Sequence, residues 1–446
     1  MSFRNKLAIT AGKTSRFLLQ KLTSGGGSSM PGKIALAIDP DVLKDLARDY
    51  EVIVVTGTNG KTLTTPLIVN ILKEAFGYIV TNPTGANLAQ GIVSTFLAAP
   101  NNKNKRKFAV LEIDEATLHK VTKYIKPNLV VLTNIFRDQL DRYGEIYTTY
   151  NMIKKGLADI PTAQLILNGD MPLFNDSSLP NPKKYYGFSF DQKAALDADT
   201  SADGIICPHC EHIIKYNYIT YSNQGDYYCP HCDFKRPELE YKLTKLNHLT
   251  EKSSTFTIDN ETYEIPIGGL YNIYNALAAI AVAEYYNIDK ATIHCGLEKQ
   301  KNVFGRQEQI KIGDKTATIM LVKNPVGLNQ VIDTMMLAPY DFSLVHLVND
   351  KYADGIDVSW IWDGHYEKLQ SRNISQVITG GRRTKDITLR MKVAGFEDRL
   401  TVLDNLDQLP DHIKEVKTDH VYILATYTAM LELRKILTDQ GYIGRK

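Results

Sequence analysis

Glu51-Val-Ile-Val-Val-Thr-Gly-Thr-Asn-Gly-Lys-Thr-Leu-Thr-Thr65 is the stretch from which the fold of this chain can be predicted. Its β-branched run, Val52 to Val55, has the composition of a buried strand and stops at a turn with two glycines. Apolar residues then recur at helical spacing over residues 67–76, and Gly77 ends the pattern. We place Pro66 in the first turn of this helix, where proline is tolerated. The sequence therefore predicts a strand, a glycine turn and a helix in direct succession.

Such a unit brings backbone N–H groups and the positive end of a helix dipole to one point, where phosphates bind. In Gly60-Lys61-Thr62 the lysine would reach the outer phosphates and the threonine would ligate magnesium. The match to the P-loop rule is incomplete, because Val55 stands where the first glycine is expected and Gly57 follows two residues later. An ordinary turn with a surface lysine is the alternative. The flanking strand and amphipathic helix favour a nucleotide site.

Length and composition exclude several classes of protein. The 446 residues are enough for about three domains, and 43% hydrophobic content is ordinary for a globular chain. With 52 basic and 50 acidic residues, no global field would recruit nucleic acid. No apolar stretch approaches the length of a bilayer span, and the N-terminus lacks the pattern of a secretory signal. We therefore predict a cytoplasmic protein.

Residues 1–22 predict a basic amphipathic helix, because basic and apolar residues alternate there without any acidic residue. The basic residues are Arg4, Lys6, Lys13, Arg16 and Lys21. Such a helix can rest on an anionic membrane surface, which would place the protein at the inner face of the membrane. Packing against the body of the protein is the alternative and the commoner use of an amphipathic helix. The run of serine and glycine at residues 24–29 predicts a flexible linker, so residues 1–45 are assigned to helix and linker.

Between about residues 30 and 200, strand-like runs alternate with helical stretches, which is the signature of an α/β fold. The runs are Val52–Thr56, Phe108–Ile113, Leu129–Thr133 and Leu165–Asn168. Ligands of an open parallel sheet gather at the carboxyl ends of its strands. Acidic and polar residues follow three of these runs, at residues 112–115, 133–144 and 168–170. Hard oxygen ligands near a phosphate loop indicate Mg²⁺, although each acid alone is more often a helix cap or a surface charge.

Two cysteine pairs interrupt this alternation within an insertion over residues 203–236. Cys207-Pro-His-Cys210 and Cys229-Pro-His-Cys232 have the spacing of a four-cysteine zinc ribbon around a tyrosine-rich hairpin. Four thiolates leave no position for a substrate, so we predict structural zinc, with His209 and His231 as alternative ligands. Nucleic-acid contact by the ribbon is a weaker alternative. The fifth cysteine, Cys295, is predicted to be a buried thiol.

The last part of the chain, residues 309–446, predicts a second α/β domain. Before it, Gly268 begins a helix with Asn272 and Asn275 in its first turns, and Arg306 in the following hinge could contact an anion. The loop over residues 349–363 contains four aspartates and both tryptophans. It is interpreted either as a site or interface, or as a capped turn with buried tryptophans.

Five motifs in this order resemble the Mur ligase family, whose members join amines to carboxylates using ATP. They are Thr56-Gly-Thr-Asn-Gly-Lys-Thr62, Thr133-Asn-Ile135 with Asp141-Arg-Tyr143, Asn168-Gly-Asp170, Asn272-Ile-Tyr-Asn-Ala-Leu-Ala-Ala279 and Gly305-Arg306. The cysteine pairs, Lys323-Asn-Pro-Val-Gly327 and Ala353-Asp-Gly-Ile-Asp-Val-Ser-Trp-Ile-Trp-Asp363 resemble more closely the branch of this family that amidates lipid II. The resemblance extends from about residue 30 to residue 435.

The resemblance implies a central ATP-binding domain over residues 46–305, carrying the ribbon, and a Rossmann-like α/β domain over residues 306–446. It implies ATP-dependent amidation of the D-glutamate α-carboxylate in the lipid II stem peptide to D-isoglutamine, through an acyl phosphate. Ammonia would come from a partner glutaminase called GatD, which the final domain would contact. An autonomous Mur-type ligase that adds an amino acid and a zinc-ribbon NTPase that acts on nucleic acid are the alternatives.

The resemblance also assigns site residues. The nucleotide-binding positions are Gly57, Thr58, Asn59, Gly60, Lys61, Thr62, Thr64, Asn275 and Arg306. Thr62 and Glu112 would hold magnesium, and Asp357, with Asp354 as its rival, would complete a triad with the cysteine and histidine of the glutaminase. Lys61, Glu112 and Asp357 are thus the catalytic candidates. Asp138-Gln-Leu-Asp141 stands where many relatives carry a metal-binding histidine, so it gives no support for a second magnesium ion.

Overall fold

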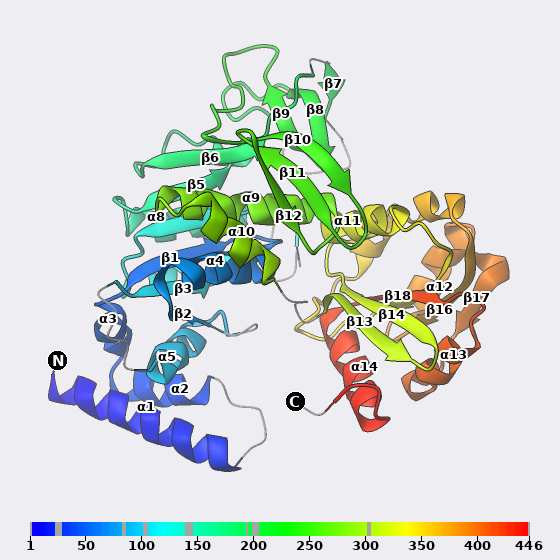
Figure 1. Ribbon diagram of the computed structural model, residues 1–446, viewed down its shortest axis with the longest axis horizontal. Helices are drawn as coiled ribbons and strands as arrows, with labels where there is room; N and C mark the ends of the chain where they lie inside the picture. Colours follow the sequence, from blue (N-terminus) through cyan, green and yellow to red (C-terminus); the bar gives the residue numbers. More distant parts are fainter. Residues whose placement is uncertain are drawn as a thin grey trace.

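The computed structural model describes residues 2–22, 29–82, 86–100, 106–138, 146–192, 195–198, 205–300 and 305–444. A nine-stranded sheet and a six-stranded sheet form two bodies side by side, and a small three-stranded sheet lies at the top of the first body in Figure 1. The predicted α/β class is confirmed.

The nine-stranded sheet has the order β12-β11-β10-β6-β5-β4-β1-β3-β2. Its strands are β1 (Glu51–Thr56), β2 (Ile79–Thr81), β3 (Phe108–Glu112), β4 (Leu129–Leu132), β5 (Gln164–Asn168), β6 (Lys183–Phe188), β10 (Tyr241–Leu249), β11 (Ser254–Ile258) and β12 (Glu261–Ile265). The strands from β2 to β10 pair in parallel, and β10, β11 and β12 pair antiparallel. The chain leaves β1 towards β2 and β3 on one side and reaches β4 on the other, so a crevice is expected at the carboxyl end of β1.

Helices cover this sheet. They are α4 (Lys61–Phe76), α5 (Ala89–Ala98), α6 (Glu115–Val121), α8 (Ile146–Ala158), α9 (Leu270–Tyr285) and α10 (Lys290–Glu298), with the short η1 (Pro172–Phe174). Helix α4 packs against α9 and α10 and begins directly after Gly60. Pro66 therefore lies inside α4, and its predicted place in the first turn is wrong. Because the helix starts at Lys61, directly after the turn, Pro66 is its sixth residue and lies in the second helical turn. Proline has no backbone N–H, so the carbonyl of Thr62 lacks its helical hydrogen-bond donor.

Three helices precede the sheet. They are α1 (Phe3–Leu22), α2 (Met30–Ile38) and α3 (Val42–Ala47), and α1 packs on α2 and α5 along the lower edge of the molecule in Figure 1. The predicted N-terminal helix is therefore present, whereas the predicted linker at 24–29 lies almost wholly outside the described residues. Across the described ranges, none of the helices combines the length and the hydrophobicity that a membrane span requires.

The six-stranded sheet has the order β13-β14-β18-β15-β16-β17 and is parallel except for the β13–β14 pair. Its strands are β13 (Arg306–Ile312), β14 (Lys315–Leu321), β15 (Phe342–Leu347), β16 (Ile374–Gly380), β17 (Leu400–Val402) and β18 (His420–Ala425). Its helices are α11 (Pro325–Met336), α12 (Thr384–Val393), α13 (Leu409–Glu415) and α14 (Tyr427–Asp439), with the short η2 (Ser359–Asp363), η3 (Tyr366–Ser371), η4 (Glu397–Arg399) and η5 (Leu406–Gln408). Two apolar clusters fill this body, separate from the cluster that fills the first.

The three-stranded sheet is the predicted ribbon, formed by β7 (Leu196–Asp197), β8 (Lys215–Tyr221) and β9 (Gln224–Tyr228). Asp170, which is fully buried, attaches it to the large sheet. One oxygen of Asp170 accepts a hydrogen bond from Arg236 at 2.8 Å, and the other accepts from Tyr274 at 2.6 Å and from the Phe188 amide at 2.8 Å. The carboxylate is thereby fully used, so the predicted contribution of Asp170 to a magnesium site is wrong. Its strand-end position reflects an anchoring role.

Cys295 is exposed on α10, so its prediction as a buried thiol is also wrong. The apolar spacing around it places Ile293 and Leu297 in the core, and Cys295 lies between them on the opposite side of the helix.

The Asp170 network leads to a stability prediction. Replacing Arg236 with Met should lower the free energy of unfolding by ~3–5 kcal/mol, because it leaves a buried carboxylate without its cation. Lys242→Met is the control, since Lys242 meets the exposed Glu238 only at 3.9 Å and should change stability by less than about 0.5 kcal/mol. Urea unfolding followed by circular dichroism measures both. Equal, small effects of the two substitutions would show that Arg236 does not carry this anchor.

Candidate active site

A cleft opens at the carboxyl end of β1, between the two large sheets. The residues that line it include Asn59, Gly60 and Thr62 from the turn, Tyr271, Asn272 and Asn275 from α9, and Arg306, Gln307, Lys323, Gly327 and Gln330 from the second body. The space between these residues, counted together with the solvent that opens into it, is about 810 Å³. The crevice expected from the strand order is thus formed by residues from both bodies.

The turn after β1 is held in a conformation that requires glycine at two positions. Gly57 and Gly60 have φ values of +129° and +90°, which side chains rarely tolerate. A Cβ atom on Gly60 would also lie 2.2 Å from the side-chain oxygen of Asn275. The carbonyl of Asn59 accepts from the Thr133 hydroxyl at 2.7 Å, and its amide donates to Asn134 at 2.8 Å. The end of β4 therefore fixes the turn from one side and α9 from the other.

Lys61 is buried beneath this turn. Its ammonium forms an ion pair with Glu115 at 3.1 Å and donates to the carbonyls of Gly57 and Thr58. Burial works against the charged ammonium, but Glu115 and two further carboxylates outweigh it, so the pKa of Lys61 is raised above its ordinary value. Burial also raises the pKa of Glu115, and Lys61 opposes this effect. From the sequence, Glu115 was grouped only with the acids at residues 112–115, and its pairing with Lys61 was not predicted. The signal for it was its place three residues after the buried end of β3.

Thr62 and Glu112 lie beside Lys61 and face each other. The Thr62 hydroxyl donates to the Glu112 carboxylate at 3.2 Å. The Asn82 side chain fixes the backbone of Glu112 through two hydrogen bonds of 2.9 Å. A hydroxyl and a carboxylate at a phosphate turn are the oxygen donors that Mg²⁺ takes, so this pair fits the predicted metal.

Asp138 adds an acidic group on the side of the second body. One of its oxygens pairs with Lys323 at 2.5 Å, and the other is buried without a hydrogen-bond partner among the described residues. Gln139, Leu140 and Asp141, the rest of this motif, lie outside the described residues.

Arg306 brings a positive charge to the lining of the cleft. No carboxylate forms an ion pair with it in the described part of the chain. Burial lowers the pKa of Arg306, with Tyr271 and two carboxylates opposing the shift, and an arginine still remains protonated in such surroundings. A half-buried cation without an acidic partner among the described residues fits an anionic ligand.

Asn275 and Thr64 lie at different depths. Asn275 lines the cleft, and its side-chain amide donates to Asn272 at 3.2 Å. Thr64 is fully buried, and its hydroxyl donates to the Asn275 oxygen at 3.2 Å. The structure thus places Thr64 behind Asn275, where it orients that side chain.

The turn also contacts the second body directly. The side chains of Asn59 and Asn324 exchange two hydrogen bonds of 3.3 and 3.1 Å. Asn324 also caps α11 by accepting from the Gly327 amide at 2.8 Å. Arg137 pairs with Asp363 at 2.8 Å farther along the same boundary. The predicted phosphate turn and the Lys323–Gly327 motif therefore form one wall.

The side chains of the four ribbon cysteines point towards one another. The sulfur atoms of Cys207 and Cys232 lie 3.5 Å apart, and those of Cys210 and Cys229 lie 3.4 Å apart. All four sulfur atoms lie within 4.8 Å of one another. A tetrahedral zinc ion with Zn–S bonds of ~2.3 Å would separate its sulfur ligands by about 3.8 Å, so the four thiolates fit this metal. His209 lies outside this set, 4.0 Å from Asp233, and the ring of His231 stacks on that of His212.

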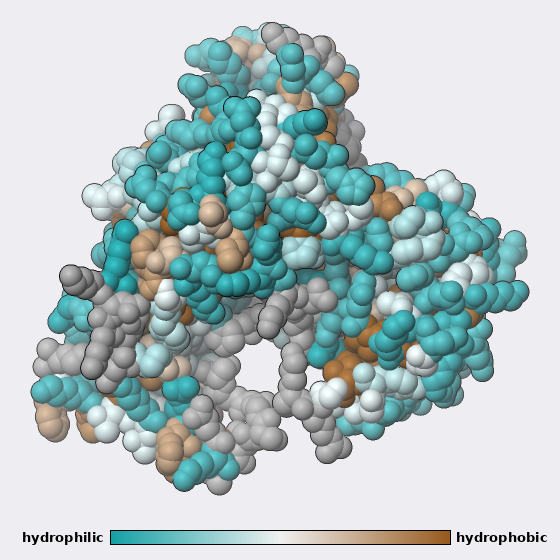
Figure 2. Space-filling view, in the orientation of Figure 1, coloured by the Kyte–Doolittle hydropathy of each residue, from teal (hydrophilic) through white to brown (hydrophobic). Residues whose placement is uncertain are grey.

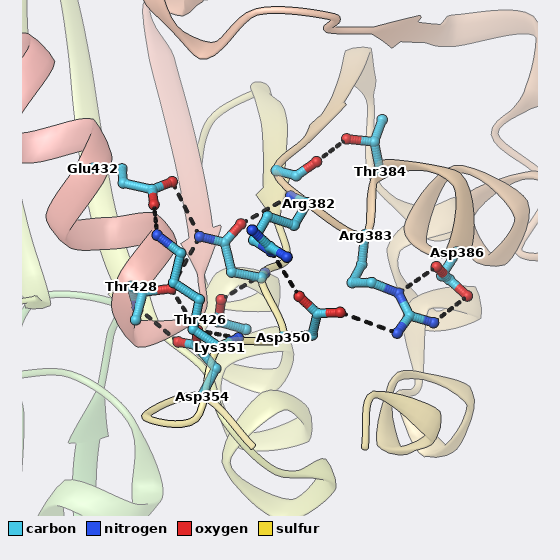
Figure 3. A network of polar contacts seen from close by, with 12 residues as sticks. Asp350, Lys351, Asp354, Arg382, Arg383, Thr384, Asp386, Thr426, Thr428 and Glu432 are labelled. Carbon is cyan, nitrogen blue, oxygen red and sulfur yellow. Dashed lines mark hydrogen bonds and ion pairs between the residues drawn. The ribbon is translucent and has the colours of Figure 1, made fainter. Parts of the chain in front are cut away.

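The loop after β15 separates the two rival aspartates. Asp354 is buried and accepts hydrogen bonds from the amide and hydroxyl of Thr428, at 2.7 and 2.5 Å, and from the Lys351 amide, as Figure 3 shows. Asp357 is partly exposed, and among the described residues it accepts hydrogen bonds from the amide and hydroxyl of Ser359, at 2.8 and 3.0 Å. Asp354 therefore fastens the loop to α14, whereas the carboxylate of Asp357 can be reached from outside.

The tryptophans of this loop combine the two interpretations made from the sequence. Trp360 is partly buried and packs against the core of the second body, whereas the Trp362 side chain is exposed and lies near the Arg390 guanidinium. The same loop also exposes Tyr352 and Ile356.

Two family profiles match the chain, the Mur ligase middle domain over residues 55–283 and the MurT ligase C-terminal domain over residues 321–430. The chain is 50% identical over 447 residues to the lipid II isoglutaminyl synthase (glutamine-hydrolyzing) subunit MurT of Streptococcus pneumoniae, covering 100% of both chains. It is 36% identical to the subunit of the same name from Staphylococcus aureus, covering 88% of this chain and 87% of the relative. The chain belongs to the MurT family.

Solved structures show how MurT folds relate to other ligases. A pseudomurein peptide ligase type C from Methanothermus fervidus matches with a TM-score of 0.66 and 21% identity, covering 90% of this chain and 81% of that one. MurF ligase from Thermotoga maritima in complex with ADP matches with a TM-score of 0.61 and 15% identity, covering 91% and 85%. The chain therefore has a Mur-ligase-like fold, as its motifs predicted.

The geometry of Lys61 predicts the outcome of its removal. Lys61→Ala should lower the rate of ATP-dependent turnover by at least roughly 10²–10³-fold, because it removes a preorganised cation from the turn. The double variant Lys61→Met with Glu115→Gln avoids leaving Glu115 as a lone buried charge and should lose as much activity. Lys73→Ala, on the exposed side of the same helix, is the control. Normal ADP release by the double variant would refute a phosphate role for Lys61.

The cysteine geometry predicts a metal-content result. Cys207→Ser should release zinc and unfold the ribbon, because a structural zinc site contributes directly to folding. Cys295→Ser, which changes an exposed thiol outside the set, should retain the metal. Elemental analysis of the purified variants measures both. Full retention of metal by the Cys207 variant would exclude a four-thiolate site.

Proposed function

We propose that this chain is the synthase subunit of a lipid II isoglutaminyl synthase. It would convert the α-carboxylate of D-glutamate in the lipid II stem peptide to the amide of D-isoglutamine, using ATP and ammonia. The observation that carries the proposal is the cleft between the two bodies, which Thr62 and Arg306 line. Glu112, hydrogen-bonded to Thr62, and Lys61, buried beneath the turn, lie directly behind this lining. The full-length similarity to MurT of S. pneumoniae supports the same reaction.

The reaction needs activation because a carboxylate is a poor electrophile. A carboxylate oxygen attacks the γ-phosphorus of ATP, which gives an acyl phosphate and ADP. Ammonia then attacks the acyl carbon, phosphate leaves, and a proton is lost to give the amide. Both steps develop charge on phosphoryl oxygens, so catalysis depends on fixed positive groups around them.

The residues of the cleft supply this environment. Lys61 and the amides of the glycine turn hold the phosphates, and Glu115 keeps Lys61 in place and protonated. Arg306, in the lining of the cleft, would contact the nucleotide. Thr62 and Glu112 would hold magnesium, which neutralises phosphate charge when bound. Asn275, oriented by Thr64, lies against the turn and would contact the nucleotide there.

The two bodies have separate tasks in this proposal. Residues 46–305 form the ATP-binding domain, stabilised by zinc in the ribbon, and residues 306–446 carry the contact with the glutaminase. The names of the MurT relatives include glutamine hydrolysis and the word subunit, which supports a partner that releases ammonia. We identify that partner as GatD.

The position of Asp357 supports a glutaminase contact on the second body. A carboxylate behind the catalytic histidine of the glutaminase would fix the tautomer of its ring. Asp357 is partly exposed and, within the described part of the chain, is hydrogen-bonded to Ser359 alone, whereas Asp354 is occupied by Thr428 and Lys351. The geometry therefore favours Asp357 for the triad.

Nucleic-acid binding by the ribbon is disfavoured by the same contacts. Arg236, one of the few basic residues there, is used internally by Asp170 and Asp226, and Lys215 pairs with Asp197. Few positive charges therefore remain for a phosphate backbone.

The test is to incubate the chain, alone or with its co-expressed glutaminase, with Mg-ATP, lipid II and either ammonium or glutamine. Mass spectrometry should show carboxyl-to-amide conversion, with glutamine serving only when the partner is present. Incorporation of an amino acid would instead support an autonomous ligase. No change in lipid II with either nitrogen source would refute the proposal.

Asp357→Asn separates the two tasks. It should lower glutamine-driven amidation by up to roughly 10⁴-fold, the loss seen when the aspartate of such a triad is replaced, and leave ammonium-driven amidation unchanged. Asp398→Asn, an exposed aspartate of the same body, is the control. Equal loss with both nitrogen sources would mean that Asp357 is structural.

A further inference from the structure

Helix α1 has one face that packs on the protein and an opposite face that none of the described residues covers. Asn5, Ala8 and Gly12 are buried against α2 and α5. The approach is close, because a Cβ atom on Gly12 would lie 2.6 Å from the side chain of Leu97. The packing alternative drawn from the sequence thus accounts for only half of the helix.

The uncovered face carries large apolar side chains. Phe3, Leu7, Phe17 and Leu18 are 85%, 51%, 57% and 50% exposed. At 3.6 residues per turn these four positions fall within about 100° of one another, on the side opposite Ala8 and Gly12. Figure 2 shows hydrophobic residues at the surface over both ends of α1, with hydrophilic residues between them.

Basic residues flank this apolar stripe. Lys6 and Lys13 lie on one side of it, Arg4 on the other, and Lys21 lies over the ring of Phe17 at 4.5 Å. Residues 1–22 contain no acidic residue, and in the described part of the chain no carboxylate pairs with the basic residues of α1. The face therefore has apolar side chains towards both ends of the helix, the exposed threonines Thr10 and Thr14 between them, and only basic residues among its charged positions.

A shallow groove continues the face. Lys13, Arg16 and Phe17 form one side of it, and the end of α5 with residues 97–100 forms the other. Its lining is again basic and apolar, so the surface extends from α1 onto the neighbouring helix.

We propose that the outward face of α1, centred on Phe3, Leu7, Phe17 and Leu18, docks on the surface of an anionic phospholipid bilayer. An amphipathic helix with aromatic and leucine residues on one face and lysines beside them lies in the plane of the interface, with its apolar side chains among the acyl chains. The lysines and arginines contact the headgroups, each contributing to attraction that decays over a Debye length.

Charge distinguishes a bilayer from the other candidates for this face. A second copy of the chain would bring the same basic border against itself, which is repulsive. In Figure 1, α1 lies at the lower left edge of the first body and the second body lies at the right, so a glutaminase contact on the second body would be on another part of the molecule.

The inference deepens the proposed function, because a lipid-linked substrate must be met at a membrane. The docked helix would hold the chain where that substrate resides. Helices α1, α2 and α5 pack together, and α5 also packs against β2. Asn82, which directly follows β2 and bonds to Ala86 before α5, fixes the backbone of Glu112. The docking helix would therefore be connected to the site through α5 and β2.

Co-sedimentation of the full chain with vesicles tests the proposal without any enzymatic readout. Wild type should bind phosphatidylglycerol vesicles and remain unbound with phosphatidylcholine vesicles. Phe17→Asp with Leu18→Asp should lower the partition coefficient at least tenfold, and Lys6→Glu with Lys13→Glu should lower it by at least about fivefold per lysine at low salt, because each reversal removes an attraction and adds a repulsion. Matched controls are Leu389→Asp with Val393→Asp, and Lys385→Glu with Lys417→Glu, all exposed positions of the second body.

The outcomes are distinguishable from a failure of the proposed reaction. Absence of binding to phosphatidylglycerol vesicles, or equal losses in the α1 variants and their controls, would overturn the docking proposal even if amidation is observed. Selective loss in the α1 variants, with unchanged activity on a water-soluble short-chain substrate and unchanged circular dichroism, would support it.

Discussion

The buried ion pair between Lys61 and Glu115 is the interaction on which the site depends. Lys61 follows β1 and Glu115 follows β3, and the parallel register that pairs Val55 with Glu112 brings the two strand ends together. A buried lysine without its carboxylate would be costly, and a misaligned strand would separate the partners. The ion pair therefore stabilises both the register of the sheet and the position of the cation beneath the turn.

The cleft follows from the same arrangement. Asn59, in the glycine turn, forms two side-chain hydrogen bonds with Asn324 of the second body. This contact holds the second body against the turn. Acidic groups surround Lys61 from one side, while Arg306 has no acidic partner among the described residues on the other. The site therefore combines oxygen donors at Thr62 and Glu112 with the positive charge of Arg306 in the lining of the same cleft. This combination suits a bound nucleotide with its metal.

Buried carboxylates elsewhere serve as anchors. Asp170 joins the ribbon to the large sheet through Arg236 and Tyr274, and Asp354 joins the loop after β15 to α14 through Thr428. Both lie near strand ends, as Glu112 does. Their complete sets of hydrogen bonds distinguish them from acids such as Asp357, whose carboxylate remains partly exposed.

The sequence by itself determined the strand, turn and helix at residues 51–76, the α/β class, the cysteine cluster and the family, because each depends on local spacing or on ordered motifs. Only the tertiary structure decided the partners of the charged side chains. Lys61 and Glu115 are 54 positions apart, Asp170 and Arg236 66, and Asp354 and Thr428 74. The position of Pro66 within α4 and the exposure of Cys295 likewise depended on where a helix starts and which side packs. A sequence pattern shows that an acid follows a strand, but whether that acid binds a metal, a lysine or a hydroxyl depends on which distant segment the fold brings beside it.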